Sequence, residues 1–172
     1  MPILPQDRDP RLITIRRGGS LTDEDHQQLA EWAAQCAEHV LPLFEAERPD
    51  DRRPRDAIEL GRAWIRGEVS MMDSRAGAFE SNAAARGLPD PAKFAALSAG
   101  QSSAVPHVAA HDLGAAAYAI RAAAAAALAD QAEVARLRER DWQRGRIPAG
   151  LRDLVLEDQQ ARNAICWNVF ED

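Results

Sequence analysis

Alanine constrains the fold of this chain more than any other feature. Seven of the eight residues from Ala122 to Ala129 are alanine, and alanine fills 35 of the 172 positions overall. Because its side chain loses no conformational entropy in a helix, alanine has the highest helix propensity. We therefore predict one long helix from Pro106 to about Leu128. Small side chains let helix axes approach closely, so the four tryptophans and four phenylalanines are expected to fill the wider gaps of a helical bundle.

Apolar residues at three- and four-residue spacing, together with capping residues, predict six further helices. The first starts at Ser20 or Thr22 and is expected to kink or end at Pro42, which lacks a backbone N–H. The second opens with Pro54 and ends at Gly67. The others are expected at residues 70–86, 90–103, 130–144 and from 151 to the end of the chain.

Residues 1–19 do not fit this helical pattern. They contain three prolines, a glycine pair and a short apolar alternation from Leu12 to Ile15. A lone strand cannot satisfy its own backbone hydrogen bonds, and the sequence offers no convincing partner strand. The predicted fold is therefore all-α: a compact bundle of about seven helices in one domain, residues 20–172, preceded by a short extended N-terminal arm, residues 1–19.

The charge balance and the length of the apolar segments exclude several classes of protein. Acidic residues outnumber basic ones by 27 to 21, and the net charge of -6 argues against a nucleic-acid partner, which needs a basic face to bind. The longest apolar run is too short to span a bilayer, and no signal peptide opens the chain. Two cysteines 130 positions apart do not make a disulfide framework. We therefore expect a cytoplasmic protein with no membrane partner.

Four residues are candidate metal ligands. His107 and His111 are four apart, so on one helix they would share a face and could hold one divalent metal ion. Cys36 and His39 are three apart on the first predicted helix and could add ligands. The alternative is that the histidines bond to carbonyls and carboxylates in the core and that the cysteines pack as small hydrophobic groups. Stoichiometric metal that is lost on His111→Ala would support the metal site.

Recognised catalytic patterns are missing from the sequence. There is no G-x-S-x-G elbow, no Walker or G-x-G-x-x-G phosphate loop, and no glutamate directly after His107 as zinc proteases require. We therefore predict no catalytic residue, and no cofactor beyond the possible divalent metal.

Acidic residues near the end of the first predicted helix are a candidate partner-binding surface. Glu45, Glu47, Asp50 and Asp51 lie within seven positions of one another. Such a patch could steer the encounter with a basic partner, so reversing these charges is expected to slow association, especially at low salt. The alternative is that the patch serves only solubility.

Several stretches occur together, and in order, in a pattern that resembles one family. The stretches are residues 17–23, 32–41, 55–59, 63–64, 67–68, 107–119, 141–148 and 163–170. Their content is similar to bacterial immunity proteins of polymorphic toxin systems, the immunity-protein-five-like group. The resemblance implies an all-helical, non-enzymatic protein that protects its own cell by binding and blocking a cognate toxin. It implies no catalytic residue at any position of this chain.

Two other function classes remain open beside the immunity protein. The first is a metal-dependent helical-bundle enzyme or metal sensor that uses His107 and His111. The second is an accessory protein of a biosynthetic cluster, which would bind a small apolar ligand in a pocket between the alanine-rich helices. A homodimer is compatible with each of the three classes.

Overall fold

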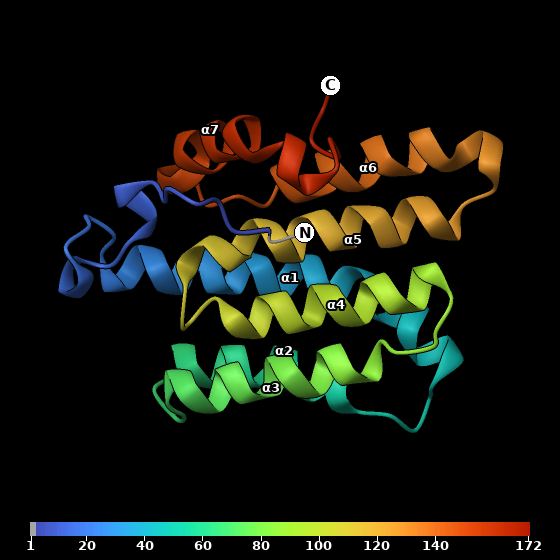
Figure 1. Cartoon of the computed structure of the whole chain (residues 1–172), viewed down its shortest axis with the longest axis horizontal. Helices are drawn as coiled ribbons and strands as arrows, with labels where there is room; N and C mark the ends of the chain where they lie inside the picture. The colour runs from blue at the N-terminus through green and yellow to red at the C-terminus, as the bar shows by residue number, and fades with distance from the viewer. Residues whose placement is uncertain (1–2) are drawn as a thin grey trace.

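The computed structural model describes residues 3–172 and has no β-strand among them. Within this range the chain forms seven α-helices packed as a bundle (Figure 1), which confirms the predicted fold class. The helices are α1 (Asp23–Glu47), α2 (Arg53–Ile65), α3 (Met71–Ala84), α4 (Asp90–Ala104), α5 (Asp112–Ala126), α6 (Ala132–Arg144) and α7 (Arg152–Arg162). In this part of the chain no helix is both long enough and apolar enough to cross a membrane.

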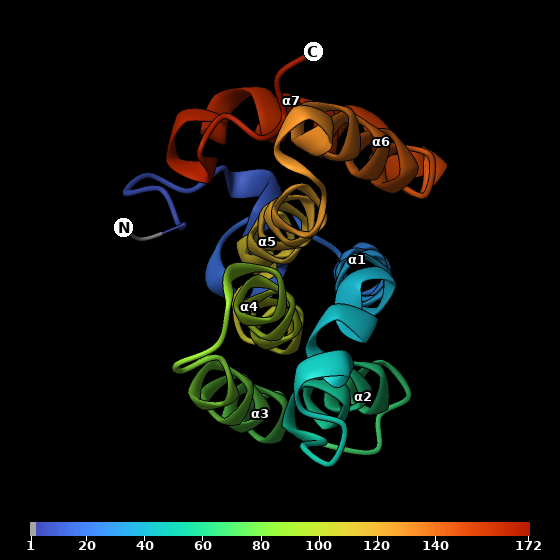
Figure 2. The same ribbon diagram turned by 90° about the vertical axis from the view of Figure 1, so that its right-hand side faces the viewer.

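The helices lie in three layers, as Figure 2 shows. Helices α2 and α3 form one outer layer, α1, α4 and α5 the middle, and α6 and α7 the other outer layer. Helix α4 packs against α1, α3 and α5, so the middle layer holds most of the core. The alanine-rich helix α5 is buried along most of its length, because it lies between α1 and α4 on one side and α6 on the other.

Small residues let these helices pack closely, as predicted. The hydroxyl of Ser98 on α4 donates to the backbone oxygen of Ala115 on α5 at 2.7 Å. The hydroxyl of Ser74 on α3 donates to the backbone oxygen of Ser103 on α4 at 2.8 Å, and Ser103 donates in return to the backbone oxygen of Ser74. These bonds satisfy buried hydroxyls without a bulky side chain at the contact.

The large aromatic residues fill the gaps only in part. Trp32 and Phe44 of α1 are fully buried, and the indole N–H of Trp32 donates to the backbone oxygen of Gln143 on α6 at 3.0 Å. Phe79, in contrast, is 57% exposed on the outer face of α3. Its exposure corrects the expectation that every aromatic residue packs between helices.

The arm before α1 is more compact than an extended chain. Two short 3-10 helices, Pro10–Leu12 and Ile15–Arg17, fold it back on itself, and a single bridge joins Thr14 to Leu21. Leu12 is buried and anchors the arm on the core. Gly19 sits where an added Cβ would overlap the backbone oxygens of Pro10 and Ile13, so only glycine fits this close approach.

Three predicted helix boundaries are wrong. Helix α5 begins at Asp112 rather than Pro106, because the residues before it form turns. Helix α1 does not end at Pro42 but continues to Glu47, while a kink at Pro42 stays a prediction. Pro42 and Glu38, whose carbonyl loses its helical partner, are both exposed, so water can satisfy that carbonyl. Helix α7 ends at Arg162, and Trp167 and Asn168 beyond it have left-handed φ angles of 58° and 57° that no helix continues through.

Candidate functional site

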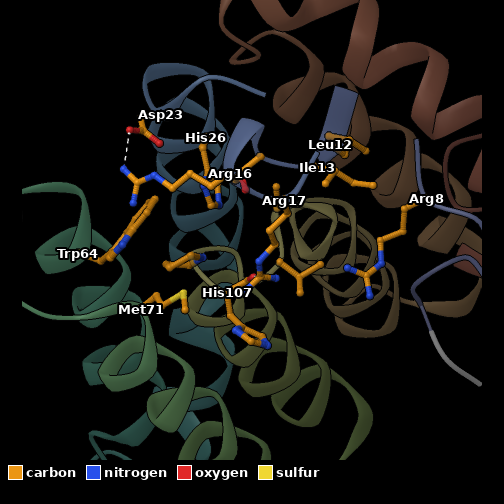
Figure 3. A pocket seen from close by; sticks show the side chains of 14 residues that line it. Arg8, Leu12, Ile13, Arg16, Arg17, Asp23, His26, Trp64, Met71 and His107 are labelled. Atoms are coloured by element: carbon orange, nitrogen blue, oxygen red, sulfur yellow. Dashed lines mark hydrogen bonds and ion pairs between the residues drawn. The ribbon is translucent and has the colours of Figure 1, made fainter. Parts of the chain in front are cut away.

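A pocket of about 350 Å³ opens where the arm meets the bundle (Figure 3). Its walls come from the arm, the first turn of α1, the adjoining ends of α2 and α3, and the connection between α4 and α5. A volume of this size can take a small molecule or a few side chains of a partner. The polar and large side chains that line it include Arg8, Arg16, Arg17, Asp23, His26, Trp64, Met71 and His107.

Positive charge gathers at this pocket although the chain as a whole is acidic. Arg16 pairs with Asp23 at 3.0 Å, but both side chains are largely exposed and the pair is therefore weak. Arg8 and Arg17 have no carboxylate partner among residues 3–172, and Arg17 donates from Nη1 to the backbone oxygen of His107 at 3.3 Å. In Figure 3, Arg8 lies at one end of the pocket and Arg17 lies near its middle, beside His107.

Two histidines and a tryptophan also line the pocket. The Nε2–H group of His26 donates to the backbone oxygen of Val105 at 2.8 Å, and its ring packs on Trp64 with the ring centres 4.8 Å apart. Nδ1 of His107 is buried and has no hydrogen-bond partner in the described part of the chain. Burial, and after it the charges of three nearby arginines, lower the pKa of His107, so its imidazole is neutral at pH 7.

His107 and His111 do not share a helix face, which corrects the geometry predicted for them. His107 lies in the turn after α4, and His111 directly precedes α5. Val108 between them is extended, with φ -141° and ψ 109°, and this conformation interrupts any helical path. The Nδ1–H group of His111 donates to Oε1 of Gln101 at 2.7 Å, and burial lowers the pKa of His111 to about 4.

The other two candidate ligands lie on α1. The Nδ1–H group of His39 donates to Oε2 of Glu139 on α6 at 2.7 Å, and its ring stacks on Trp142 at 3.6 Å. Cys36 is fully buried, and burial raises the pKa of its thiol well above the ordinary value. Within residues 3–172 no three His, Cys, Asp or Glu side chains are grouped so that they could hold one metal ion. The four predicted ligands are therefore not gathered at one point, and metal binding stays a prediction.

The predicted acidic surface is half neutralised by two arginines of α2. Nε of Arg55 donates to Oε1 of Glu45 at 2.7 Å. Arg53 binds the carboxylate of Asp51 with contacts as short as 2.6 Å, and this guanidinium holds the pKa of Asp51 below its ordinary value. A broad depression of about 550 Å³ lies over residues 47–53 of the same segment. The two predicted carboxylates without a cation partner among the described residues are Glu47 and Asp50.

A buried charge cluster joins α7 to the start of α5, and the sequence patterns did not identify it. Nη2 of Arg162 lies 2.5 Å from Oδ2 of Asp158 and 3.4 Å from Oδ1 of Asp112. Nη1 of Arg162 also donates to the backbone oxygens of Ala110 at 2.8 Å and Ile3 at 3.4 Å. The four-residue spacing of Asp158 and Arg162 was the only sign of this cluster in the sequence, and it did not indicate that Asp112 belongs to the cluster. All three charged side chains are buried, so the cluster positions the arm and α7 on the bundle.

The fold and the pocket define an all-α bundle protein with a cationic pocket beside its N-terminal arm. Residues 19–150, which are 132 of the 172 in the chain, match the sequence model of the family described as Imm-5 like putative immunity protein. The chain therefore belongs to this family, as its resemblance implied. The match covers helices α1 to α6. It includes neither α7 nor the residues of the arm up to and including Gly18. No curated protein and no solved structure matches the chain significantly.

Proposed function

We propose that this chain is an immunity protein that protects a bacterial cell by binding one cognate toxin. The observation that carries the proposal is the family match over residues 19–150. An immunity protein that acts by binding needs a specific surface but no catalytic group. The proposal places the chain in the cytoplasm, where it would meet a toxin before the toxin reached its target.

The environment of the potential nucleophiles supports binding rather than catalysis. The five buried serines of α3 and α4 donate to backbone carbonyl oxygens, so their hydroxyls serve helix packing. Both cysteines are buried thiols, and burial raises the pKa of Cys166 to about 11. A thiol with a raised pKa is a poor nucleophile, because the reactive form is the thiolate.

The proposed mechanism is steric. A standard protein–protein interface buries about 800 Å² on each partner. The chain exposes 8423 Å² in total, so such an interface would take about a tenth of its surface. A rigid bundle that covers the substrate cleft of a toxin over such an area leaves no room for the substrate. We expect a complex of one chain with one toxin.

The test is to express the chain together with each toxic protein encoded beside its gene. The expected result is that one of these proteins arrests growth alone, that the chain restores growth, and that the two proteins elute as a stoichiometric complex. A toxin from an unrelated immunity pair is the control, and the chain should neither bind nor neutralise it. If the chain restores growth without forming a complex, the binding mechanism is wrong. If it rescues growth from none of the neighbouring toxins, the proposed function is wrong.

A further inference from the structure

We propose that the pocket between the arm and the bundle is a docking site for an acidic segment of a protein partner. The pocket would hold a carboxylate of that segment between Arg8 and Arg17, while apolar side chains of the partner cover the rim. The identity of the partner as a toxin rests on the proposed function, but the charge and shape of the pocket do not.

Charge complementarity is the first argument. Eleven of the 20 arginines form ion pairs with carboxylates of the described residues, whereas Arg8 and Arg17 at the pocket do not. Arg75 on α3 is likewise without a carboxylate partner there, and its guanidinium lies 4.9 Å from the ring centre of Phe79. An incoming carboxylate would form charge-assisted hydrogen bonds with two guanidinium groups that have no carboxylate partner among residues 3–172.

The apolar rim of the pocket favours a protein over a small molecule. Two of the large apolar side chains that are exposed among residues 3–172, Ile15 and Met71, belong to the segments that form the pocket. Met71 lines the pocket, and Ile15, which is 62% exposed, lies between the lining residues Thr14 and Arg16. A small ligand inside the pocket would leave this rim uncovered, whereas the core of a protein interface buries such side chains.

The backbone of the arm follows a fixed path. Two backbone hydrogen bonds hold the arm folded back on itself. The N–H of Ser20 donates to the oxygen of Pro10, and the N–H of Leu21 donates to the oxygen of Ile13, each at 3.0 Å. Arg11 ties the arm to α7 through Glu157 at 2.8 Å. Because the backbone that carries the arginines is already ordered, binding would cost less conformational entropy than the ordering of a free tail. The arm is therefore suited to present charge to a partner.

The first experiment uses a synthetic peptide of alternating glutamate and leucine and needs no toxin. The peptide is titrated into the ¹⁵N-labelled chain and followed by nuclear magnetic resonance. The expected result is that the indole N–H of Trp64 and the backbone amides of Arg17 and His107 shift together. The double variant Arg8→Glu/Arg17→Glu should bind the peptide at least about tenfold more weakly, which corresponds to a loss of about 1.4 kcal/mol.

The matched control is Arg86→Glu/Arg138→Glu. Both arginines are exposed, neither has a carboxylate partner among the described residues, and neither lines the pocket. The control makes the same change in net charge and should leave peptide binding within about twofold of the wild type. An equal loss in both variants, or shifts that map elsewhere, would overturn the proposal. Displacement of the peptide by inorganic phosphate at the same residues would identify a small-anion site instead and would also overturn it.

The second experiment uses a toxin that the wild-type chain neutralises. Arg8→Glu/Arg17→Glu should weaken the complex at least about tenfold, mainly by slowing association, and added salt should reduce the difference. Wild-type affinity in this variant would contradict the docking site and leave the proposed function standing. If the wild-type chain binds no toxin, the proposed function fails, and the peptide experiment still tests the pocket.

Discussion

At the residue scale, Arg162 faces two buried carboxylates and can neutralise only one of them fully. Asp158 is the nearer, at 2.5 Å, and Asp112 lies at 3.4 Å. Burial raises the pKa of Asp112 to about 7 and outweighs the opposing effect of Arg162, while the charge of Asp158 raises it further. Oδ2 of Asp112 has no hydrogen-bond partner in the described part of the chain, which is consistent with a carboxyl group that gains little from ionising.

The raised pKa of Asp112 predicts a pH dependence of stability. Between about pH 4 and 7 the unfolded chain releases this proton while the folded chain keeps it, so stability falls as the pH rises. Asp112→Asn cannot titrate. Between these pH values, the free energy of unfolding of the wild type minus that of Asp112→Asn should fall by up to about 1.4 kcal/mol for each pH unit. Above about pH 7 this difference should stay constant. Urea denaturation at several pH values measures this difference, and a difference that does not change with pH would contradict the prediction.

Only one residue of the pocket, His107, was a candidate site residue from the sequence. This residue was selected for its spacing from His111, yet the structure places His107 beside Arg17 of the arm. Nothing in the local pattern distinguished Arg8 and Arg17 from the other arginines. What distinguishes them is that they line the pocket and have no carboxylate partner there, and this depends on residues far away in the sequence.

At the element scale, α3 packs on α2 and α4 at a point where only glycine fits easily. A Cβ at Gly77 would lie 2.7 Å from Cδ1 of Leu60 and 3.0 Å from Oγ of Ser103. The leucine side chain can move, but the Ser103 hydroxyl is held by its bond to Ser74. Gly77 therefore keeps α3 close to its neighbours at the cost of intrinsic helix propensity.

Gly77→Ala is predicted to destabilise the bundle. The substitution gains about 1 kcal/mol of helix propensity, but overpacking costs about 1–3 kcal/mol, so a net loss of about 1 kcal/mol is expected. The matched control is Gly150→Ala, because a Cβ there meets nothing within 4 Å. Thermal unfolding followed by circular dichroism should show a lower Tm for Gly77→Ala than for the control. A Tm at or above that of the wild type would show that α3 can move away without cost.

Helix existence was predictable from local signals, and helix starts were predicted best where a cap or a proline marked the first turn. Ser70 and Asp73 form a complete capping box at the start of α3, where the helix was predicted to begin, and Pro54 lies in the first turn of α2. The start of α5 was wrong because the alanine pattern does not distinguish a 3-10 turn from the α-helix that follows. The turn is held in part by the long-range bond from Arg162 to the backbone oxygen of Ala110.

At the scale of the whole molecule, the two candidate surfaces lie at opposite ends of α1. The cationic pocket includes Asp23 and His26 from the start of α1, whereas the acidic loop follows its end at Glu47. A helix of 25 residues is about 37 Å long, so the two surfaces are distinct. Arg48 and Arg52 of the loop and Arg53 at the start of α2 offset these carboxylates, so the steering field of the loop is weaker than its acidic residues alone suggest.

Reversing the unpaired charges of the loop should therefore have a small effect on toxin binding. Glu47→Lys/Asp50→Lys leaves the paired carboxylates of Glu45 and Asp51 in place, and we expect it to slow association less than about threefold at low salt. Stopped-flow measurements at low and high salt, made beside Arg8→Glu/Arg17→Glu, compare the two surfaces directly. A larger effect from the loop than from the pocket would restore the acidic patch as the main steering surface.

The sequence by itself determined that the chain is an all-α bundle and that it belongs to an immunity-protein family. Helix formation depends on hydrogen bonds four residues apart, on alanine propensity and on local caps, all of which can be read along the chain. Only the tertiary structure decided which charges are neutralised and where a pocket opens. Arg8, Trp64 and His107 line one pocket although they are separated by 99 positions, because packing of the helices brings the arm to the α4–α5 connection. The electrostatic character of each surface then follows from distances between residues that no local pattern relates.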